Sequence, residues 1–126
     1  MERSTFFLIS GLGALTYSIY AGLKYYAITG LGLLTNTEAK QLIKDKTIQH
    51  IIDVRTETEF NMGHYPKSKN VPIQSFSKRK FAQLNKNAGI LVYCNTGQRA
   101  RRAAELLRKY GFNHVYYIEG TYHEII

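Results

Sequence analysis

The chain has 126 residues, of which 44% are hydrophobic and 21% charged, a composition that is ordinary for one globular domain and excludes a low-complexity chain. Its formal charge is +8, but no nucleic-acid-binding motif accompanies the scattered Lys and Arg residues, so we expect no nucleic-acid partner. The single cysteine excludes an internal disulfide and, with only four histidines that lack ligand spacing, leaves no zinc set, so we predict neither a metal nor a cofactor.

The first thirty residues form an apolar segment. Residues 5–23 (TFFLISGLGALTYSIYAGL) carry no charge and as a helix would measure about 28 Å, close to the thickness of a bilayer core. A cleaved signal peptide would need a basic head and a small-residue cleavage site, and a buried core helix is rarely apolar on every side. We therefore expect residues 1–30 to be a single-pass membrane anchor with its core at about 5–23, followed by a soluble domain at 31–126.

The charges around this segment predict its orientation. From residue 31 on there are fifteen Lys and Arg against eight Asp and Glu, so more positive charge follows the anchor than precedes it. This asymmetry favours a domain on the cytoplasmic side. Small residues recur at intervals of four and could pair two anchor helices as a homodimer: Ser10, Ala14, Ser18 and Gly22. Small residues are also simply frequent in membrane helices, and that interpretation is the stronger of the two.

The rest of the chain alternates between predicted helices and strands. In chain order we predict a helix that starts at the capping box Thr35–Glu38, a strand at 48–54, a helix at 56–62, a short strand at 71–73, a helix at 75–84, a central strand at 90–93, a helix through 100–107 that ends at Gly111, and a strand at 115–118. This alternation predicts an α/β domain with a mainly parallel central sheet flanked by helices.

Cys94 stands directly after the predicted central strand, at the end where open α/β sheets form their ligand sites. The loop CNTGQR (94–99) can wrap its backbone N–H groups around the sulfur, because Gly97 permits tight curvature. Amides at a helix N-terminus stabilise a thiolate, and Arg99 adds a cation for an oxyanion. The alternative is a buried structural cysteine, which this order of strand, cysteine, glycine, arginine and helix disfavours.

Four stretches occur in a familiar order. They are DVRTETEF (53–60), GHYP (63–66) followed by NVP (70–72), CNTGQR (94–99), and AAELLRKYGF (103–112) followed by IEG (118–120). In this order they resemble the single-domain rhodanese family of sulfurtransferases, whose active-site loop reads Cys-x-x-Gly-x-Arg. The resemblance covers about residues 31–120 and implies a single rhodanese-like domain after the apolar helix.

The resemblance implies a persulfide mechanism. Cys94 would take sulfane sulfur from a small-molecule or protein donor such as thiosulfate, and pass it to cyanide or to a thiol acceptor. The donor would be bound by the rest of the loop: Arg99, Asn95, Thr96, Gly97 and Gln98. Asp53 and Arg55 would support the loop, although a structural ion pair at a strand end explains these two residues equally well.

Two other functions remain open. A membrane-tethered binding or scaffold module could keep the fold, but it would have no chemical need for Cys94, Gly97 and Arg99. A cysteine-dependent phosphatase or arsenate reductase uses the longer spacing Cys-x5-Arg, which would place the arginine at Ala100. The shorter loop in this chain suits sulfur better than a tetrahedral oxyanion.

Overall fold

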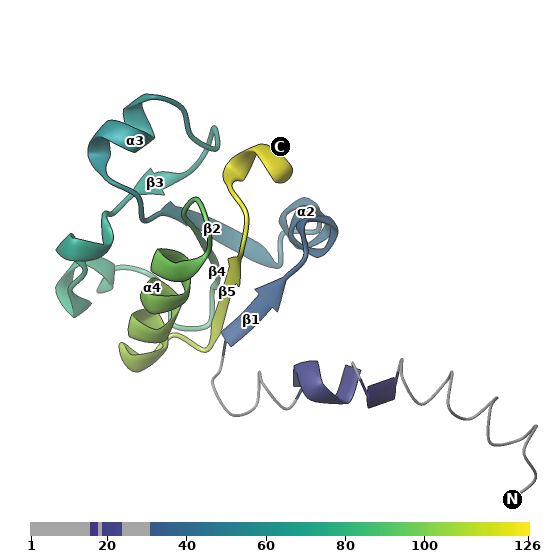
Figure 1. Cartoon of the computed structure of the whole chain (residues 1–126). Coiled ribbons are helices and arrows are strands. Elements are labelled where there is room, and N and C mark those ends of the chain that lie inside the picture. Colours follow the sequence, from purple (N-terminus) through teal and green to yellow (C-terminus); the bar gives the residue numbers. More distant parts are fainter. Residues whose placement is uncertain (1–15, 18, 24–30) are drawn as a thin grey trace, which may run out of the picture.

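The computed structural model describes residues 16, 17, 19–23 and 31–126 of the chain (Figure 1). Residues 31–126 contain a five-stranded sheet with the order β1-β5-β4-β2-β3, in which every pair of neighbouring strands is parallel. The strands are β1 (Leu31–Leu34), β2 (Ile48–Asp53), β3 (Lys69–Asn70), β4 (Gly89–Tyr93) and β5 (His114–Ile118). The predicted α/β class with a parallel sheet is confirmed, and β4 is the central strand.

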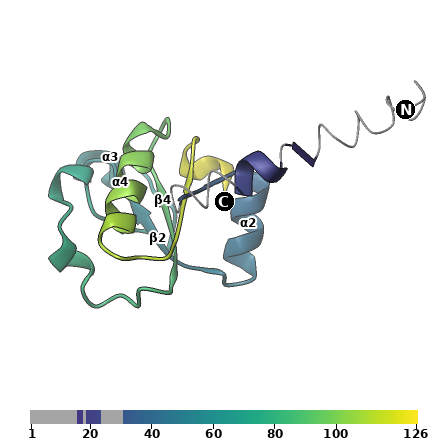
Figure 2. The same ribbon diagram turned by 90° about the horizontal axis from the view of Figure 1, so that it is seen from below.

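Helices and turns cover both faces of this sheet (Figure 2). On one face α4 (Gln98–Lys109) packs beside the 3-10 turn Lys78–Phe81. On the other face lie α2 (Asn36–Lys44) and the 3-10 turn Tyr122–Glu124. The residues that α4 turns toward the sheet are mostly small, which lets the helix approach the strands closely: Ala100, Ala103, Ala104 and Leu107. The sheet thus separates two apolar cores.

Side chains at the helix starts match signals in the sequence. The hydroxyl of Thr35 accepts a hydrogen bond from the Glu38 N–H at 3.1 Å, and the Glu38 carboxylate accepts one from the Thr35 N–H at 3.1 Å. This is the predicted capping box. A second capping box, Thr56 with Glu59, opens α3 (Glu57–Asn61) close to the carboxyl end of β2. That second box was not predicted, although its spacing is the same.

The strand predicted at 71–73 is wrong in its position. Regular pairing is limited to β3 (Lys69–Asn70), and the chain then turns at Ile73–Ser75. Pro72 has no N–H, so the ladder cannot continue regularly through it. The backbone N–H groups on either side of Pro72 still form hydrogen bonds with this part of the chain. Val71 donates to the Asp53 carbonyl, at the end of β2, at 3.0 Å, and Ile73 donates to the carbonyl of Val54, the next residue, at 3.1 Å.

The helix predicted at 75–84 is also wrong. The chain is extended at Phe76 and Ser77 and forms only the 3-10 turn Lys78–Phe81. Five residues on a continuous α-helix span about 140° of rotation, which would turn Phe76 and Phe81 away from each other. Their rings instead lie 4.9 Å apart between centroids and pack on the same core. The break at Ser77 allows both rings to be buried together.

The start of the domain holds a strand that was not predicted. β1 lies within an apolar run that continues from the expected anchor, so its pattern does not stand out in the sequence. Most of the expected anchor lies outside the described residues, as do Ser10, Ala14 and Ser18. In the parts of the chain that the structure describes, no helix has the length and apolar character needed to cross a membrane.

Candidate active site

Cys94 lies at the carboxyl ends of the parallel strands. It follows β4 directly, and that strand is buried along its whole length. Cys94 itself is only 1% exposed. The following helix, α4, begins at Gln98, so a short loop carries the chain from the central strand to a helix N-terminus. The predicted arrangement of strand, cysteine, loop and helix is confirmed.

Two backbone N–H groups point at the sulfur of Cys94. The Gly97 N–H lies 3.1 Å from Sγ, and the Ala100 N–H, in the first turn of α4, lies 3.3 Å from it. Gly97 has a φ of 96°, and a Cβ added there would lie 2.8 Å from the Glu119 Cα. A residue with a side chain would therefore be strained and would also collide with Glu119, the residue after β5. Amide donors held in this way stabilise negative charge on sulfur.

Arg99 forms a two-pronged ion pair with Glu59. Its Nη1 lies 2.7 Å from one carboxylate oxygen and its Nη2 lies 3.0 Å from the other. The Glu59 carboxylate holds the Arg99 pKa above its ordinary value. The guanidinium keeps further N–H donors for an anion, because the pair uses only one edge of its fork. Arg99, the predicted anion-binding residue at the end of the loop, thus has its charge compensated by Glu59.

Glu59 belongs to the family-like stretch 53–60, but it was not predicted as a residue of this site. It also accepts hydrogen bonds from the Asn95 side chain at 2.8 Å and from the N–H and hydroxyl of Thr56, both at 3.0 Å. The Arg99 guanidinium, followed by the Thr56 N–H, holds the Glu59 pKa far below its ordinary value. The Thr56–Glu59 capping spacing could have drawn attention to it. Its contact with the loop could not be predicted from that spacing.

Asp53 and Arg55 form a buried network below the loop. The side-chain Nη2 and Nε of Arg55 lie 2.6 Å and 3.1 Å from the same carboxylate oxygen of Asp53. The backbone N–H of Arg55 donates a hydrogen bond to the other carboxylate oxygen at 2.9 Å. The Tyr93 hydroxyl donates to Asp53 at 2.8 Å. Burial raises the pKa of Tyr93 to about 12, so this hydroxyl stays protonated. The pair is thus connected to the loop through Tyr93, the residue before Cys94.

The remaining predicted residues lie on the outer side of the loop. Asn95, Thr96 and Gln98 are exposed, and of these Asn95 is held by Glu59. Ala100, where a longer phosphatase-type loop would carry its arginine, is fully buried in the core under α4. The next two arginines, Arg101 and Arg102, are exposed and each lies 3.5 Å from Glu105. The geometry therefore disfavours the phosphatase alternative.

No group of three His, Cys, Asp or Glu side chains in the described residues is arranged to hold a metal ion. His64 has a local structural role instead. Its ring stacks on the ring of Phe60 with centroids 3.6 Å apart, and its Nδ1 lies 2.8 Å from the Phe60 carbonyl oxygen. The absence of a metal from the reaction stays a prediction.

Comparison with known families gives one match across the domain. The family described as "Rhodanese-like domain" matches residues 35–126. That range includes every residue of the site described above, from Asp53 to Ala100.

Curated relatives match a shorter part of the chain. A tRNA uridine(34) hydroxylase of Buchnera aphidicola is 32% identical over 75 residues, which make up 56% of this chain and 24% of the relative. The uncharacterized protein YqhL of Bacillus subtilis is 33% identical over 72 residues, 57% of this chain and 56% of the relative. The chain therefore spans a quarter to about half of these relatives' own length.

Among solved structures, the rhodanese-like domain of the Alr3790 protein from Anabaena sp. is similar over most of its length. It is 26% identical, with a TM-score of 0.65, and the match covers 74% of this chain and 71% of that one.

Proposed function

The chain belongs to the rhodanese-like domain family, and we propose that it is a sulfurtransferase that carries sulfur as a persulfide on Cys94. The observation that supports this most directly is the pair of N–H donors from Gly97 and Ala100 at the Cys94 sulfur. A persulfide carries a negative charge, and fixed amides stabilise such a charge without a metal. The match covers only 24% of the Buchnera relative, which is too little of that protein to extend its hydroxylase activity to this chain.

The first half-reaction loads the sulfur. The Cys94 thiolate attacks the outer sulfur of a donor such as thiosulfate and forms a new S–S bond. The S–S bond of thiosulfate breaks, and sulfite leaves with the electron pair. The outer sulfur of the persulfide lies about 2 Å beyond Sγ. There we expect it to meet the free N–H groups of the first turn of α4, which have no acceptor within their own helix.

The second half-reaction returns the enzyme to its starting state. A nucleophile, either cyanide or the thiolate of an acceptor, attacks the outer sulfur. The persulfide S–S bond breaks, and its electron pair returns to Cys94 as a thiolate. The products are thiocyanate or a persulfide on the acceptor. The acceptor attacks the outer sulfur because this is the atom that is transferred, and it extends about 2 Å beyond the Cys94 Sγ.

The loop residues have separate roles in this proposal. The Arg99–Glu59 pair holds the loop in shape, and the unused N–H donors of Arg99 attract an anionic donor. Asn95 is fixed by Glu59, whereas Thr96 and Gln98 are free to contact the donor or acceptor. Asp53 and Arg55 are positioning residues that act through Tyr93.

The full chain, kept soluble with a non-ionic detergent, provides the test. It is incubated with thiosulfate, separated from excess donor, and its intact mass is measured for wild type and for Cys94→Ser. Cyanide is then added, and thiocyanate release is followed. Arg101→Ala serves as a matched control for Arg99→Ala, because both residues lie in the first turns of α4 but only Arg99 borders the loop.

We expect wild type to gain the mass of one sulfur atom and to lose it on addition of cyanide, and Cys94→Ser to gain none. Arg99→Ala should lower kcat/KM for thiosulfate at least tenfold, whereas Arg101→Ala should change it less than twofold. A folded wild-type protein that takes up sulfur from neither thiosulfate nor an organic persulfide would rule out the mechanism. It would favour the alternative of a binding module that has kept the fold.

We also propose that residues 5–23 anchor the domain in a membrane with the domain on the cytoplasmic side. The support is the uncharged run and the excess of Lys and Arg after it. The pairing of two anchors through Ser10, Ala14, Ser18 and Gly22 stays a prediction. Accessibility of residues 31–126 to added protease, in closed vesicles of known orientation, tests the side of the membrane.

A further inference from the structure

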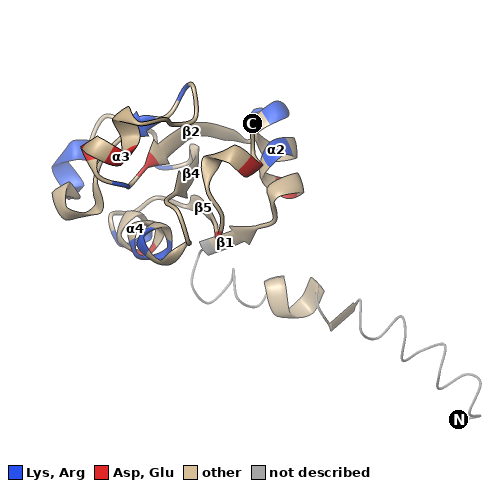
Figure 3. Ribbon diagram, turned by 45° about the horizontal axis from the view of Figure 1, so that its top comes forward, with Lys and Arg blue, Asp and Glu red and all other residues tan. Residues whose placement is uncertain are grey.

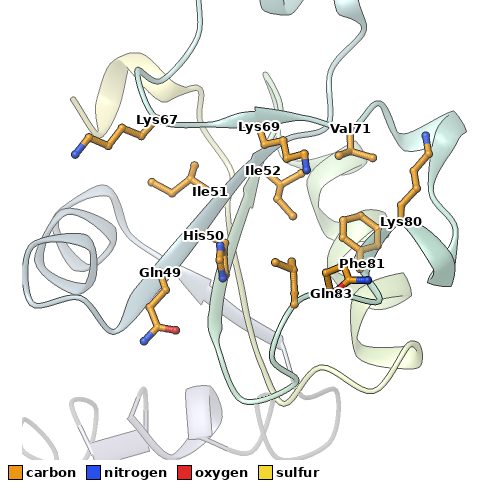
Figure 4. A pocket seen from close by; sticks show the side chains of 11 residues that line it. Gln49, His50, Ile51, Ile52, Lys67, Lys69, Val71, Lys80, Phe81 and Gln83 are labelled. Atoms are coloured by element: carbon orange, nitrogen blue, oxygen red, sulfur yellow. The ribbon is translucent and has the colours of Figure 1, made fainter.

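A pocket lies beside β2 and contains none of the residues of the Cys94 loop (Figure 4). It has a volume of about 230 Å³. Its floor is apolar and includes Ile52, Val71 and Phe81, each of which is less than a tenth exposed. Lysine side chains surround this floor, and Figure 4 shows Lys67 and Lys80 on opposite sides of it.

The pocket lies at the edge of the sheet rather than over one face. Ile51 and Ile52 are neighbours on β2, so their side chains point to opposite faces. They accordingly belong to different cores, and both nevertheless line the pocket. On this side of β2 the only described strand is β3, which pairs with Ile52 and Asp53 alone. The stretch Ile48–Ile51 therefore has no strand paired with it on that side within residues 31–126.

The charges at the pocket are of one sign. Three lysines line it, Lys67, Lys69 and Lys80, and no carboxylate does. Within the described residues none of the three forms a salt bridge. Lysine on an edge strand also guards against aggregation, which would account for Lys69 alone. It does not account for Lys80, which comes from the turn Lys78–Phe81 and reaches the same pocket from another segment.

We propose that this pocket binds an extended acidic segment of a partner protein, which adds a strand beside β2. Addition of a strand to an open edge supplies main-chain hydrogen bonds, and pockets for alternate side chains supply specificity. Here one apolar side chain enters the floor at Ile52, Val71 and Phe81, and acidic side chains lie against the lysines. A nucleic acid would use the lysines, but neither the strand edge nor the apolar floor.

Fluorescent synthetic peptides test the proposal with the full chain in non-ionic detergent. The probe alternates aspartate or glutamate with leucine or isoleucine. One control peptide carries N-methyl groups on alternate backbone amides, and a second replaces its acidic residues with lysine. Anisotropy gives the affinities, and amide hydrogen exchange reports on residues 49–51. A short oligothymidine is added as a competitor.

The protein variants are matched in charge. Lys67→Gln, Lys69→Gln and Lys80→Gln are combined in one variant, and Lys40→Gln, Lys44→Gln and Lys109→Gln in the other. The second set is exposed and lies on α2 and α4, where Figure 3 shows further basic residues. Retained sulfur uptake by Cys94 shows that each variant is folded.

The acidic peptide should bind wild type, slow exchange at residues 49–51, and bind the pocket variant roughly tenfold more weakly. The control variant should lose less than twofold, and the N-methylated peptide should not bind. Equal losses in the two variants, equal binding of the N-methylated peptide, or no binding of the acidic peptide would each overturn the proposal. So would lysine-dependent displacement of the peptide by the oligothymidine, which would favour a nucleic acid.

Discussion

Glu59 and Arg99 are forty positions apart in the sequence and form the ion pair that borders the loop around Cys94. Glu59 also fixes Asn95 and caps α3 through Thr56, so a single carboxylate joins α3 to the loop and to the start of α4. In the resting protein this carboxylate compensates the charge of Arg99. The loop therefore presents its backbone amides to an incoming anion, together with only part of the arginine's charge.

Replacement of Glu59 should produce a pH-dependent loss of stability. The pKa of Glu59 is depressed below its ordinary value of 4.5 by Arg99, so its ionised form stabilises the fold. That contribution is fully present above pH 4.5 and is lost as the pH falls toward the depressed pKa. Glu59→Gln should cost about 1 kcal/mol of unfolding free energy at pH 7. The difference from wild type should shrink as the pH is lowered below 4.5.

Denaturant unfolding at several pH values measures this difference. Glu57→Gln is the control, because Glu57 lies in the same short helix but forms no ion pair in the described part of the chain. It should cost less than 0.5 kcal/mol at every pH. A Glu59→Gln cost that stays constant from pH 7 to pH 3 would mean that the carboxylate's charge does not stabilise the fold.

Gly97 should tolerate no side chain, for reasons of both conformation and space. Gly97→Ala places a Cβ 2.8 Å from the Glu119 Cα at a φ of 96°. We expect a loss of about 2 kcal/mol or more in stability and at least a tenfold loss in sulfur transfer, because the Gly97 N–H must move away from Cys94. Thermal unfolding and thiocyanate release are the measurements.

Gly111 provides the matched control for Gly97. It has a similar φ of 103°, but the nearest atom to an added Cβ is 3.9 Å away, in the flexible side chain of Lys86. Gly111→Ala should cost about 1 kcal/mol from backbone strain alone and leave sulfur transfer unchanged. Equal activity losses in the two variants would show that the position of Gly97 beside the sulfur is not important.

At the residue scale, site residues that lie close together in one sequence motif could be predicted from the sequence. Cys94, Gly97 and Arg99 lie within six residues, and the strand and helix around them fix the geometry of the loop. Glu59 was not predicted as a site residue because its contacts with Asn95 and Arg99 join distant parts of the sequence and depend on the placement of α3. A spacing rule for helix caps identifies Thr56 and Glu59 as a pair, but it cannot identify the third partner.

At the scale of elements, α3 is too short to be stable without tertiary support. Its capping box therefore contributes much of the stability of its helical conformation. It has five residues, none of which is buried. Isolated helices of this length do not persist in water. The position of Glu59 therefore depends on the cap at Thr56 as well as on Arg99.

Two capping boxes in the chain allow this dependence to be tested. Thr56→Ala and Thr35→Ala remove equivalent caps, and each should cost about 1 kcal/mol of stability. Only Thr56→Ala should also lower kcat/KM for thiosulfate, by about threefold or more. The reason is that α3 carries Glu59, which binds the loop through Asn95 and Arg99, whereas α2 has no such residue. Steady-state kinetics beside denaturant unfolding separates the two effects. Matching kinetic losses in both variants would contradict a specific role of α3.

Helices and strands with a clear hydrophobic periodicity in their own sequence were predicted correctly. Segments whose conformation depends on tertiary packing were not. The helix α4 and strands β2, β4 and β5 show the expected periodicity and were predicted within about two residues. The segment at 75–84 was predicted as a helix but forms only short 3-10 turns. Its actual course follows from the burial of Phe76 and Phe81 against one core, which no local pattern reveals.

At the scale of the whole molecule, the chain enters the sheet at the end opposite the candidate active site. Leu31, the first residue of β1, is level with Val115 on β5, which is level with Ile90 on β4. Cys94 lies four residues further along, about 13 Å toward the other end of the sheet. If residues 5–23 lie in a membrane, the loop at Cys94 is thus on the side of the domain that faces away from the chain's entry point.

This arrangement predicts that membrane attachment and turnover can be separated in the full chain. Leu8→Arg, Leu12→Arg and Leu15→Arg together should release the protein from membranes, because each arginine near the centre of a spanning helix costs about 3 kcal/mol. Sulfur transfer from thiosulfate should change less than twofold, since the substitutions lie outside residues 31–126, which contain every residue of the candidate site. Ser4→Arg, at the polar head of the segment, is the control and should leave attachment intact. Carbonate extraction of membranes followed by thiocyanate release in each fraction gives both readouts. Wild type that is already extracted by carbonate would rule out an integral anchor, and a large loss of turnover in the released variant would show that the segment contributes to the active site.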